Sequence, residues 1–197
     1  MNSPRVTNKV TDKATDKVTD EAREKAGDQA TGPVASITPR DAWLAVLRKT
    51  TSDVFATMVG ISLDVTPATV GTPLVSESQD ASVVAYVTGM IGIAGAVRAV
   101  FSLRCSDLTA ARIASRMLGI SAEEAAAQKS DAIGEICNMI AGHFKHEVGH
   151  GDSCTLTIPT VVVGGSYSIH CLEKGERLAF PITCEGETVL VALDIRG

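Results

Sequence analysis

Between Ser121 and Val148 the apolar residues recur at intervals of three and four, and this spacing restricts the fold more than any other feature of the chain. The residues that follow the spacing are Ile133, Ile136, Cys137, Ile140, Phe144 and Val148. Such a period predicts an amphipathic helix with one buried face. Ser121 and Glu124 have the spacing of a capping box, so we expect a single long helix over residues 122–148.

Further helices and strands are predicted on both sides of this helix. Before it, the patterns predict a helix over 39–58, a strand over 61–65, two strands within 82–103 joined near 90–95, and a helix over 106–118. After it, they predict strands within 154–164, 166–172, 177–184 and 188–195. This order predicts an α/β fold of the α+β type, in which helices pack against a largely antiparallel sheet and two similar halves share that sheet.

Residues 1–35 differ in composition from the rest of the chain. They contain a degenerate repeat of four residues (VTNK, VTDK, ATDK, VTDE, AREK) and no aromatic residue. Threonine is a poor helix former, and valine and alanine are too small to build a core here. We therefore expect a disordered, low-complexity tail over 1–35 and one folded domain over 38–197.

The composition excludes several classes of protein. A net charge of -5 argues against a nucleic-acid-binding protein, which usually carries a basic patch. No run of apolar residues approaches the 18 or so that a membrane helix needs, and the N-terminus lacks the apolar core of a signal peptide. We expect a cytoplasmic protein without a nucleic-acid or membrane partner. Its five cysteines, which include no C-x-x-C pair, are expected to be small buried thiols.

The face of the long helix opposite its apolar side carries Asp131, Glu135, Asn138, Gly142 and Lys145. Residues three or four apart lie on one side of a helix, so Glu135 and Asn138 project from the same surface about one turn apart. Gly142, one turn further on, costs roughly 1 kcal/mol of helix stability relative to alanine but leaves a flat place for a partner. The spacing alone is also compatible with an ordinary solvated helix face.

The strings DAIGEICNMIAGHF and TIPTVVVGGSY resemble the CheC/CheX/FliY family of chemotaxis phosphatases. This resemblance suggests a function for the exposed face of the helix. The signature of that family is an Asp or Ser, three residues, a Glu, two residues, an Asn, and a Pro about twenty residues on. The matching residues are Asp131, Glu135, Asn138 and Pro159. Only one Glu-x-x-Asn motif is present, which is similar to CheX; in the first helix Phe55 and Met58 stand where a second pair would lie.

The resemblance implies a CheC/CheX-like fold and a protein-aspartate phosphatase that acts on a phosphorylated CheY-like response regulator. Asn138 would hold the attacking water in line with the phosphorus, and Glu135 would contact the active-site lysine of the regulator. Asp131 and Gly142 would belong to the partner-binding surface. The enzyme would need no cofactor or metal of its own, because Mg²⁺ belongs to the phosphorylated partner. A homodimer is expected, since exposed sheet edges in the family often pair.

Two other functions remain open. The same fold occurs in flagellar-switch relatives, so the domain could bind a regulator without catalysis. The segment 146–150 also reads H-E-x-x-H, which in zinc hydrolases places two imidazoles on one helix face. Glycines at 149 and 151 end the helix there and no third ligand is evident, so this zinc site is the weaker hypothesis.

Overall fold

The structure is a computed structural model that describes residues 39–63, 85–165, 167, 169 and 175–196. These residues belong to one compact unit. The predicted tail over 1–35 and most of the predicted strand over 166–172 lie outside the described residues. None of the helices in the described part of the chain combines the length and the apolar character that a membrane crossing requires.

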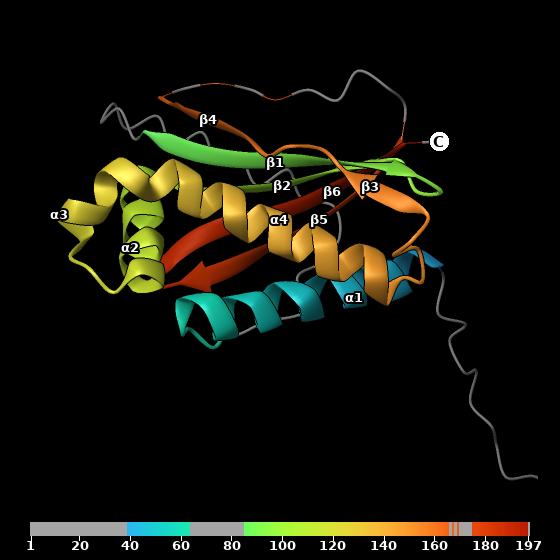
Figure 1. Ribbon diagram of the computed structural model, residues 1–197, viewed down its shortest axis with the longest axis horizontal. Coiled ribbons are helices and arrows are strands. Elements are labelled where there is room, and N and C mark those ends of the chain that lie inside the picture. Colours follow the sequence, from blue (N-terminus) through green and yellow to red (C-terminus); the bar gives the residue numbers. More distant parts are fainter. Residues whose placement is uncertain (1–38, 64–84, 166, 168, 170–174, 197) are drawn as a thin grey trace, which may run out of the picture. The chain divides into compact units, whose positions relative to one another are not determined.

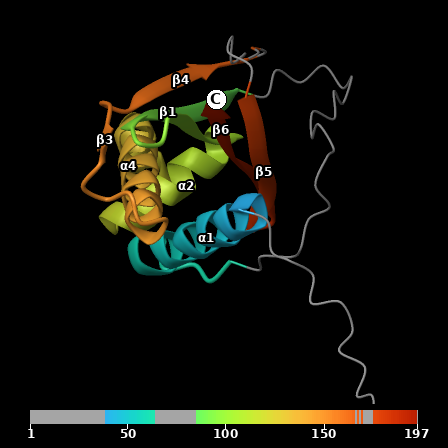
Figure 2. The same ribbon diagram turned by 90° about the vertical axis from the view of Figure 1, so that its right-hand side faces the viewer.

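The described residues form a six-stranded antiparallel sheet with helices on one of its faces (Figures 1 and 2). Its strands are β1 (Tyr86–Gly95), β2 (Ala99–Ser106), β3 (Cys154–Leu156), β4 (Thr160–Gly164), β5 (Gly175–Cys184) and β6 (Glu187–Arg196). The strand order is β3-β1-β2-β6-β5, and β4 also pairs with β1. The two short strands therefore share one edge of β1, with β4 along Tyr86–Met90 and β3 along Ile93–Gly95.

The helices lie on the face of the sheet where every second residue is apolar. They are α1 (Pro39–Val54), which continues as a π-helical turn over Phe55–Val59, then α2 (Asp107–Leu118), α3 (Ala122–Ala125), a 3-10 turn over Ala126–Gln128, and α4 (Lys129–Glu147). In β2, buried and half-buried residues alternate strictly. That alternation is typical of an antiparallel sheet with one covered face, and it confirms the predicted fold class.

The core lies between the helices and this face of the sheet. Phe55, Phe101, Phe144 and Phe180, from two helical segments and two strands, are at most 1% exposed. Phe144 of α4 also packs edge-on against Trp43 of α1, with 5.8 Å between the ring centroids. α4 thus contacts the sheet, α1 and α2, and these contacts fix its position in the fold.

Several predicted boundaries differ from the structure. The capping box at Ser121 is present, but the helix that it starts ends after one turn, and the 3-10 turn separates it from α4. β1 continues to Gly95, so residues 90–95, predicted to join two strands, are themselves part of the strand. The predicted strand over 154–164 is interrupted at Thr157–Pro159, where proline has no N–H for a strand ladder. Residues 61–63 of the predicted strand over 61–65 are irregular, and the other two residues lie outside the described part.

Candidate functional site

α4 lies unusually close to the sheet because a glycine faces it. A Cβ atom at Gly89 of β1 would lie 2.6 Å from Sγ of Cys137 and 2.8 Å from Cγ2 of Ile133. The predicted apolar face of the helix accordingly points inward, and Ile133, Ile136, Cys137 and Ile140 are completely buried. The opposite face of α4 is therefore fixed as the exposed one.

The residues predicted as the site lie together on that exposed face. Asp131 and Glu135 are exposed, and Asn138 and Gly142 are half-buried. We refer to these four residues as the α4 stripe. Among the described residues, the side chains of Glu135 and Asn138 enter no hydrogen bond or ion pair within the chain. Both groups are therefore available to a partner.

Lys145, which the spacing places on the same face, has a structural role instead. Its Nζ donates hydrogen bonds to the carbonyl oxygens of Gly151, at 2.6 Å, and Cys154, at 2.9 Å. The ammonium thus joins the end of α4 to the turn that leads into β3. Lys145 is half-buried like Asn138 and Gly142, so it lies on the predicted face, but its ammonium is already bonded within the chain.

A segment between β3 and β4, Thr157–Pro159, runs beside the α4 stripe, and we call it the flanking linker. A Cβ atom at Gly134 would lie 3.5 Å from Cβ of Pro159, and one at Gly142 would lie 3.9 Å from Cδ1 of Leu156. The chain from Leu156 to Pro159 therefore passes the stretch of helix whose midpoint is Asn138. The proline of the family signature thus lies against the same helix, although it is distant in sequence.

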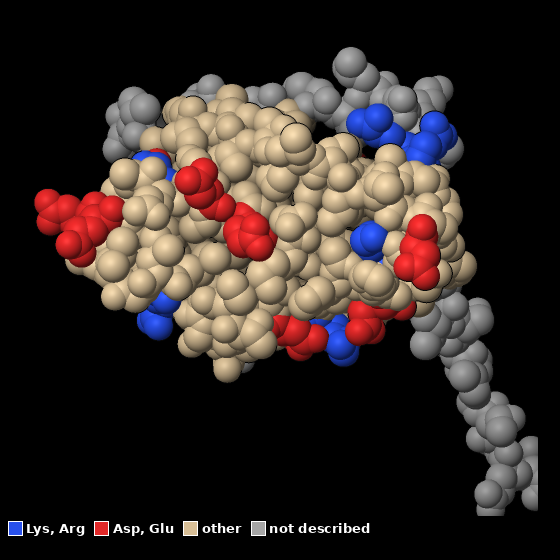
Figure 3. All heavy atoms as spheres, viewed as in Figure 1, with Lys and Arg blue, Asp and Glu red and all other residues tan. Residues whose placement is uncertain are grey.

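The exposed charged side chains nearest the stripe are mainly acidic. Asp131 and Glu135 on α4 are exposed, as are Glu123 and Glu124 on α3 (Figure 3 shows this face). Two hydrogen bonds from Ser121 hold the pKa of the Glu124 carboxyl below its usual value, since this side chain closes the capping box. The other three carboxylates have no such partner among the described residues. A basic partner surface would complement them.

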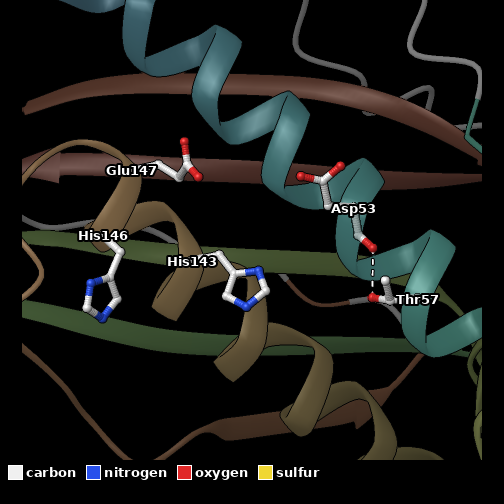
Figure 4. A pocket seen from close by; sticks show the side chains of 5 residues that line it. All are labelled: Asp53, Thr57, His143, His146 and Glu147. Atoms are coloured by element: carbon white, nitrogen blue, oxygen red, sulfur yellow. Dashed lines mark hydrogen bonds between the residues drawn. The ribbon is translucent and has the colours of Figure 1, made fainter.

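The H-E-x-x-H segment does not form the arrangement of a zinc hydrolase. α4 ends at Glu147, and His150 lies beyond a turn that includes Gly149, with a φ of 78°. Asp53, Thr57, His143, His146 and Glu147 instead line a shallow pocket between α1 and α4 (Figure 4). Glu147 also forms an ion pair with Lys49 at 3.6 Å. Among the described residues, no three His, Cys, Asp or Glu side chains are grouped closely enough to hold a metal ion.

The cysteines in the described part of the chain are free thiols in the core. Cys105, Cys137, Cys154 and Cys184 are all buried, which confirms the prediction for these four; Cys171 lies outside the described residues. Burial raises the pKa of Cys105 to about 12 and that of Cys184 to about 11. Such thiols stay protonated at neutral pH and are poor nucleophiles.

Comparison with known proteins agrees with this architecture. The family model described as chemotaxis phosphatase CheX matches residues 87–183, a range that includes Glu135, Asn138 and Pro159. No curated protein sequence matches the chain.

Solved structures show the same fold. A CheC-like superfamily protein from Shewanella sp. PV-4 is 22% identical, with a TM-score of 0.64, over 79% of this chain and 97% of the other. Chemotaxis protein CheX from Vibrio vulnificus is 22% identical, with a TM-score of 0.60, over 81% and 99%. CheX in a CheX–CheY–BeF3–Mg²⁺ complex from Borrelia burgdorferi is 20% identical, with a TM-score of 0.60, over 79% and 98%. The match to the family model over residues 87–183 and the shared fold of these structures confirm the resemblance to the CheC/CheX/FliY family that the sequence indicates.

Proposed function

We propose that this protein hydrolyses the aspartyl phosphate of a CheY-like response regulator, with Asn138 holding the attacking water. The observation that carries the proposal is the placement of Asn138: half-buried on a rigid helix, without an internal hydrogen bond among the described residues, and one turn from the exposed Glu135. Two findings support the choice of substrate. One is the match of residues 87–183 to the CheX family model, and the other is a neighbouring structure that contains CheX together with CheY, BeF3 and Mg²⁺.

An amide is suited to this reaction because it is neutral. The attacking water must approach a phosphoryl group that already carries negative charge, and a carboxylate beside it would repel that group. The amide of Asn138 offers both a carbonyl acceptor and N–H donors, so it can orient a water without adding charge. Acyl phosphates hydrolyse readily in water, and each tenfold acceleration requires only about 1.4 kcal/mol. Positioning one water is therefore a sufficient mechanism.

The other members of the α4 stripe would bind the partner. Glu135 would accept a charge-assisted hydrogen bond from the lysine of the receiver active site, which would orient the two proteins. Asp131 would extend this acidic surface by one turn. Gly142, which has no side chain, would leave space for the backbone of the partner to approach the helix.

The remaining parts of the proposal follow from the substrate. Mg²⁺ would be carried by the phosphorylated receiver domain, so this chain would contribute side chains but no metal or cofactor. We place the reaction in the cytoplasm, where receiver domains are phosphorylated, and we propose a homodimer. Binding of a regulator without catalysis is the alternative, and the experiment below separates the two.

The test follows phosphate loss from a phosphorylated CheY-type receiver domain with Mg²⁺ present. Addition of the wild-type protein should accelerate the loss of phosphate. Asn138→Ala should lower the rate of this stimulated loss roughly 100-fold, as expected for loss of a positioning group. Because Asn138 is at the surface, the variant should retain the melting temperature of the wild type. His143→Ala, an exposed change on the same helix, serves as the matched control and should retain full activity.

Three results would redirect the proposal. Full activity of Asn138→Ala would reject the assigned mechanism. Binding of the receiver domain without accelerated phosphate loss would identify a binding module. Activity that disappears in a zinc chelator that spares Mg²⁺, and also in His146→Ala, would identify a zinc hydrolase.

A further inference from the structure

Ile158 is the most exposed large apolar side chain among the described residues, at 87%. It lies in the middle of the flanking linker, between two residues that are both held in place. Exposure of a single apolar residue is ordinary on a protein surface and by itself indicates nothing. The position of Ile158 relative to Asn138 is what distinguishes it.

The linker is fixed on both sides of Ile158. On one side, the backbone N–H of Thr157 donates to the carbonyl of Gly92 at 2.9 Å, and the backbone N–H of Gly92 donates to Oγ1 of Thr157 at 2.8 Å. On the other side, Pro159 lies against Gly134 of α4, and Thr160 begins the pairing of β4 with β1. A side chain between two such anchors is presented to solvent from a fixed backbone, so little backbone entropy is lost when a partner covers it.

The level of Ile158 along α4 follows from the two contacts that flank it. Pro159 lies at Gly134 and Leu156 lies at Gly142, so the linker and the helix run in opposite directions. The eight residue-to-residue steps from Gly134 to Gly142 rise about 12 Å along the helix, and the three steps from Leu156 to Pro159 span about 10 Å if the chain is extended. Thr157 and Ile158 therefore pass the helix at the level of Asn138. Thr157 is bonded toward β1, and Ile158 takes the solvent side.

We infer that Ile158 is an apolar anchor for the phosphorylated receiver domain, an inference that rests on the proposed function. The bond to be cleaved is in the other protein, so that protein must cover Asn138 for the water to reach the phosphorus. Any partner that covers Asn138 must also contact an exposed side chain at the same level of the helix. The carboxylates of the α4 stripe supply oriented polar contacts, and Ile158 supplies an apolar contact at the level of Asn138. A central apolar residue with a polar surround is the usual composition of an affinity-determining contact.

The test separates binding from catalysis. The probe is a CheY-type receiver domain, used with BeF3 and Mg²⁺ for equilibrium binding and in its phosphorylated form for turnover. Ile158→Ser should raise the dissociation constant and KM roughly tenfold, while kcat at saturating receiver domain stays within about twofold of wild type. Asn138→Ala should show the opposite pattern, with kcat lost and binding retained. Ile158→Met, which keeps an apolar side chain at this position, should retain most of the wild-type affinity for the receiver domain.

Leu118→Ser is the matched control, because Leu118 is also an exposed apolar residue, 46% exposed, but lies at the end of α2. It should leave both constants unchanged. Unchanged affinity of Ile158→Ser, or an equal loss in Leu118→Ser, overturns the inference. If the wild type binds the receiver domain without accelerating phosphate loss, the proposed phosphatase fails, and the binding constants of the two serine variants still decide the role of Ile158. If the wild type does not bind at all, both proposals are rejected.

Discussion

Replacement of Gly89 by alanine tests the statement that α4 depends on a missing side chain in β1. The new Cβ would lie 2.6 Å from Sγ of Cys137 and 2.8 Å from Cγ2 of Ile133. Ordinary contacts between such atoms are about 3.5–4.0 Å, so the helix or its side chains must move by roughly 1 Å. Both neighbouring side chains are completely buried, so they cannot move out into solvent.

Overpacking of this kind costs about 1–3 kcal/mol, and the better strand propensity of alanine offsets roughly 0.5–1 kcal/mol of that cost. We expect a net loss of about 1–2 kcal/mol in the free energy of unfolding. For a domain of this size each kcal/mol lowers the melting temperature by roughly 2–4 °C. Urea unfolding should give the free energy, and a thermal scan should show a decrease of about 2–8 °C.

A double-mutant cycle identifies the contact responsible. Cys137→Ala removes the sulfur nearest to the new methyl group. It should therefore lower the free energy of unfolding less when it is added to Gly89→Ala than when it is made in the wild type. Residues in direct contact show coupling energies of about 0.5–3 kcal/mol. Wild-type stability in Gly89→Ala, or simple additivity of the two changes, would refute the close packing of α4 on β1.

The remaining predictions concern the glycine in the stripe and a buried thiol. Gly142→Ala should stabilise the domain by roughly 1 kcal/mol in urea unfolding, because the new Cβ meets only Leu156, at 3.9 Å. The same variant should bind the receiver domain more weakly, and unchanged affinity would remove Gly142 from the docking surface. Since burial raises the pKa of Cys105 from 9.0 to about 12, the folded state retains this proton longer than the unfolded chain. The contribution of protonated Cys105 to the free energy of unfolding should therefore be complete below pH 9 and fall as the pH rises towards 12. In urea unfolding, Cys105→Ala should lose less stability over this pH range than the wild type.

The sequence identified the functional face of α4 because helix periodicity is a local property. Ile133, Ile136 and Ile140 predicted the buried side, and the structure buries each of them completely. Once the buried side is known, the positions of Glu135 and Asn138 follow from helix geometry alone. The partner on which Glu135 and Asn138 act is a prediction, because the identity of residues on a surface does not identify the protein that binds there.

Other features depend on tertiary contacts and carry little local signal. Residues 126–128 are Ala, Ala and Gln, all good helix formers, yet a 3-10 turn interrupts the helix there. Lys145 has the spacing of an exposed residue, but the returning chain brings the carbonyls of Gly151 and Cys154 to its ammonium. The closeness of Ile158 to Asn138 was likewise not predicted. Pro159 was the available signal, since it breaks the apolar run and implies a bend beside the helix.

The double anchoring of the flanking linker on β1 also bears on how this family can vary in length. Cys154–Leu156 of β3 pairs with Ile93–Gly95 of β1, and Thr157 is bonded to Gly92, so the chain is attached to β1 before it reaches Ile158. Residues added or removed at the exposed turn around Gly149 precede both attachments. Such insertions and deletions can accumulate during evolution without sliding the linker along α4. The number of residues between Asn138 and Pro159 can then change at this turn while the distance between the two residues in space stays the same.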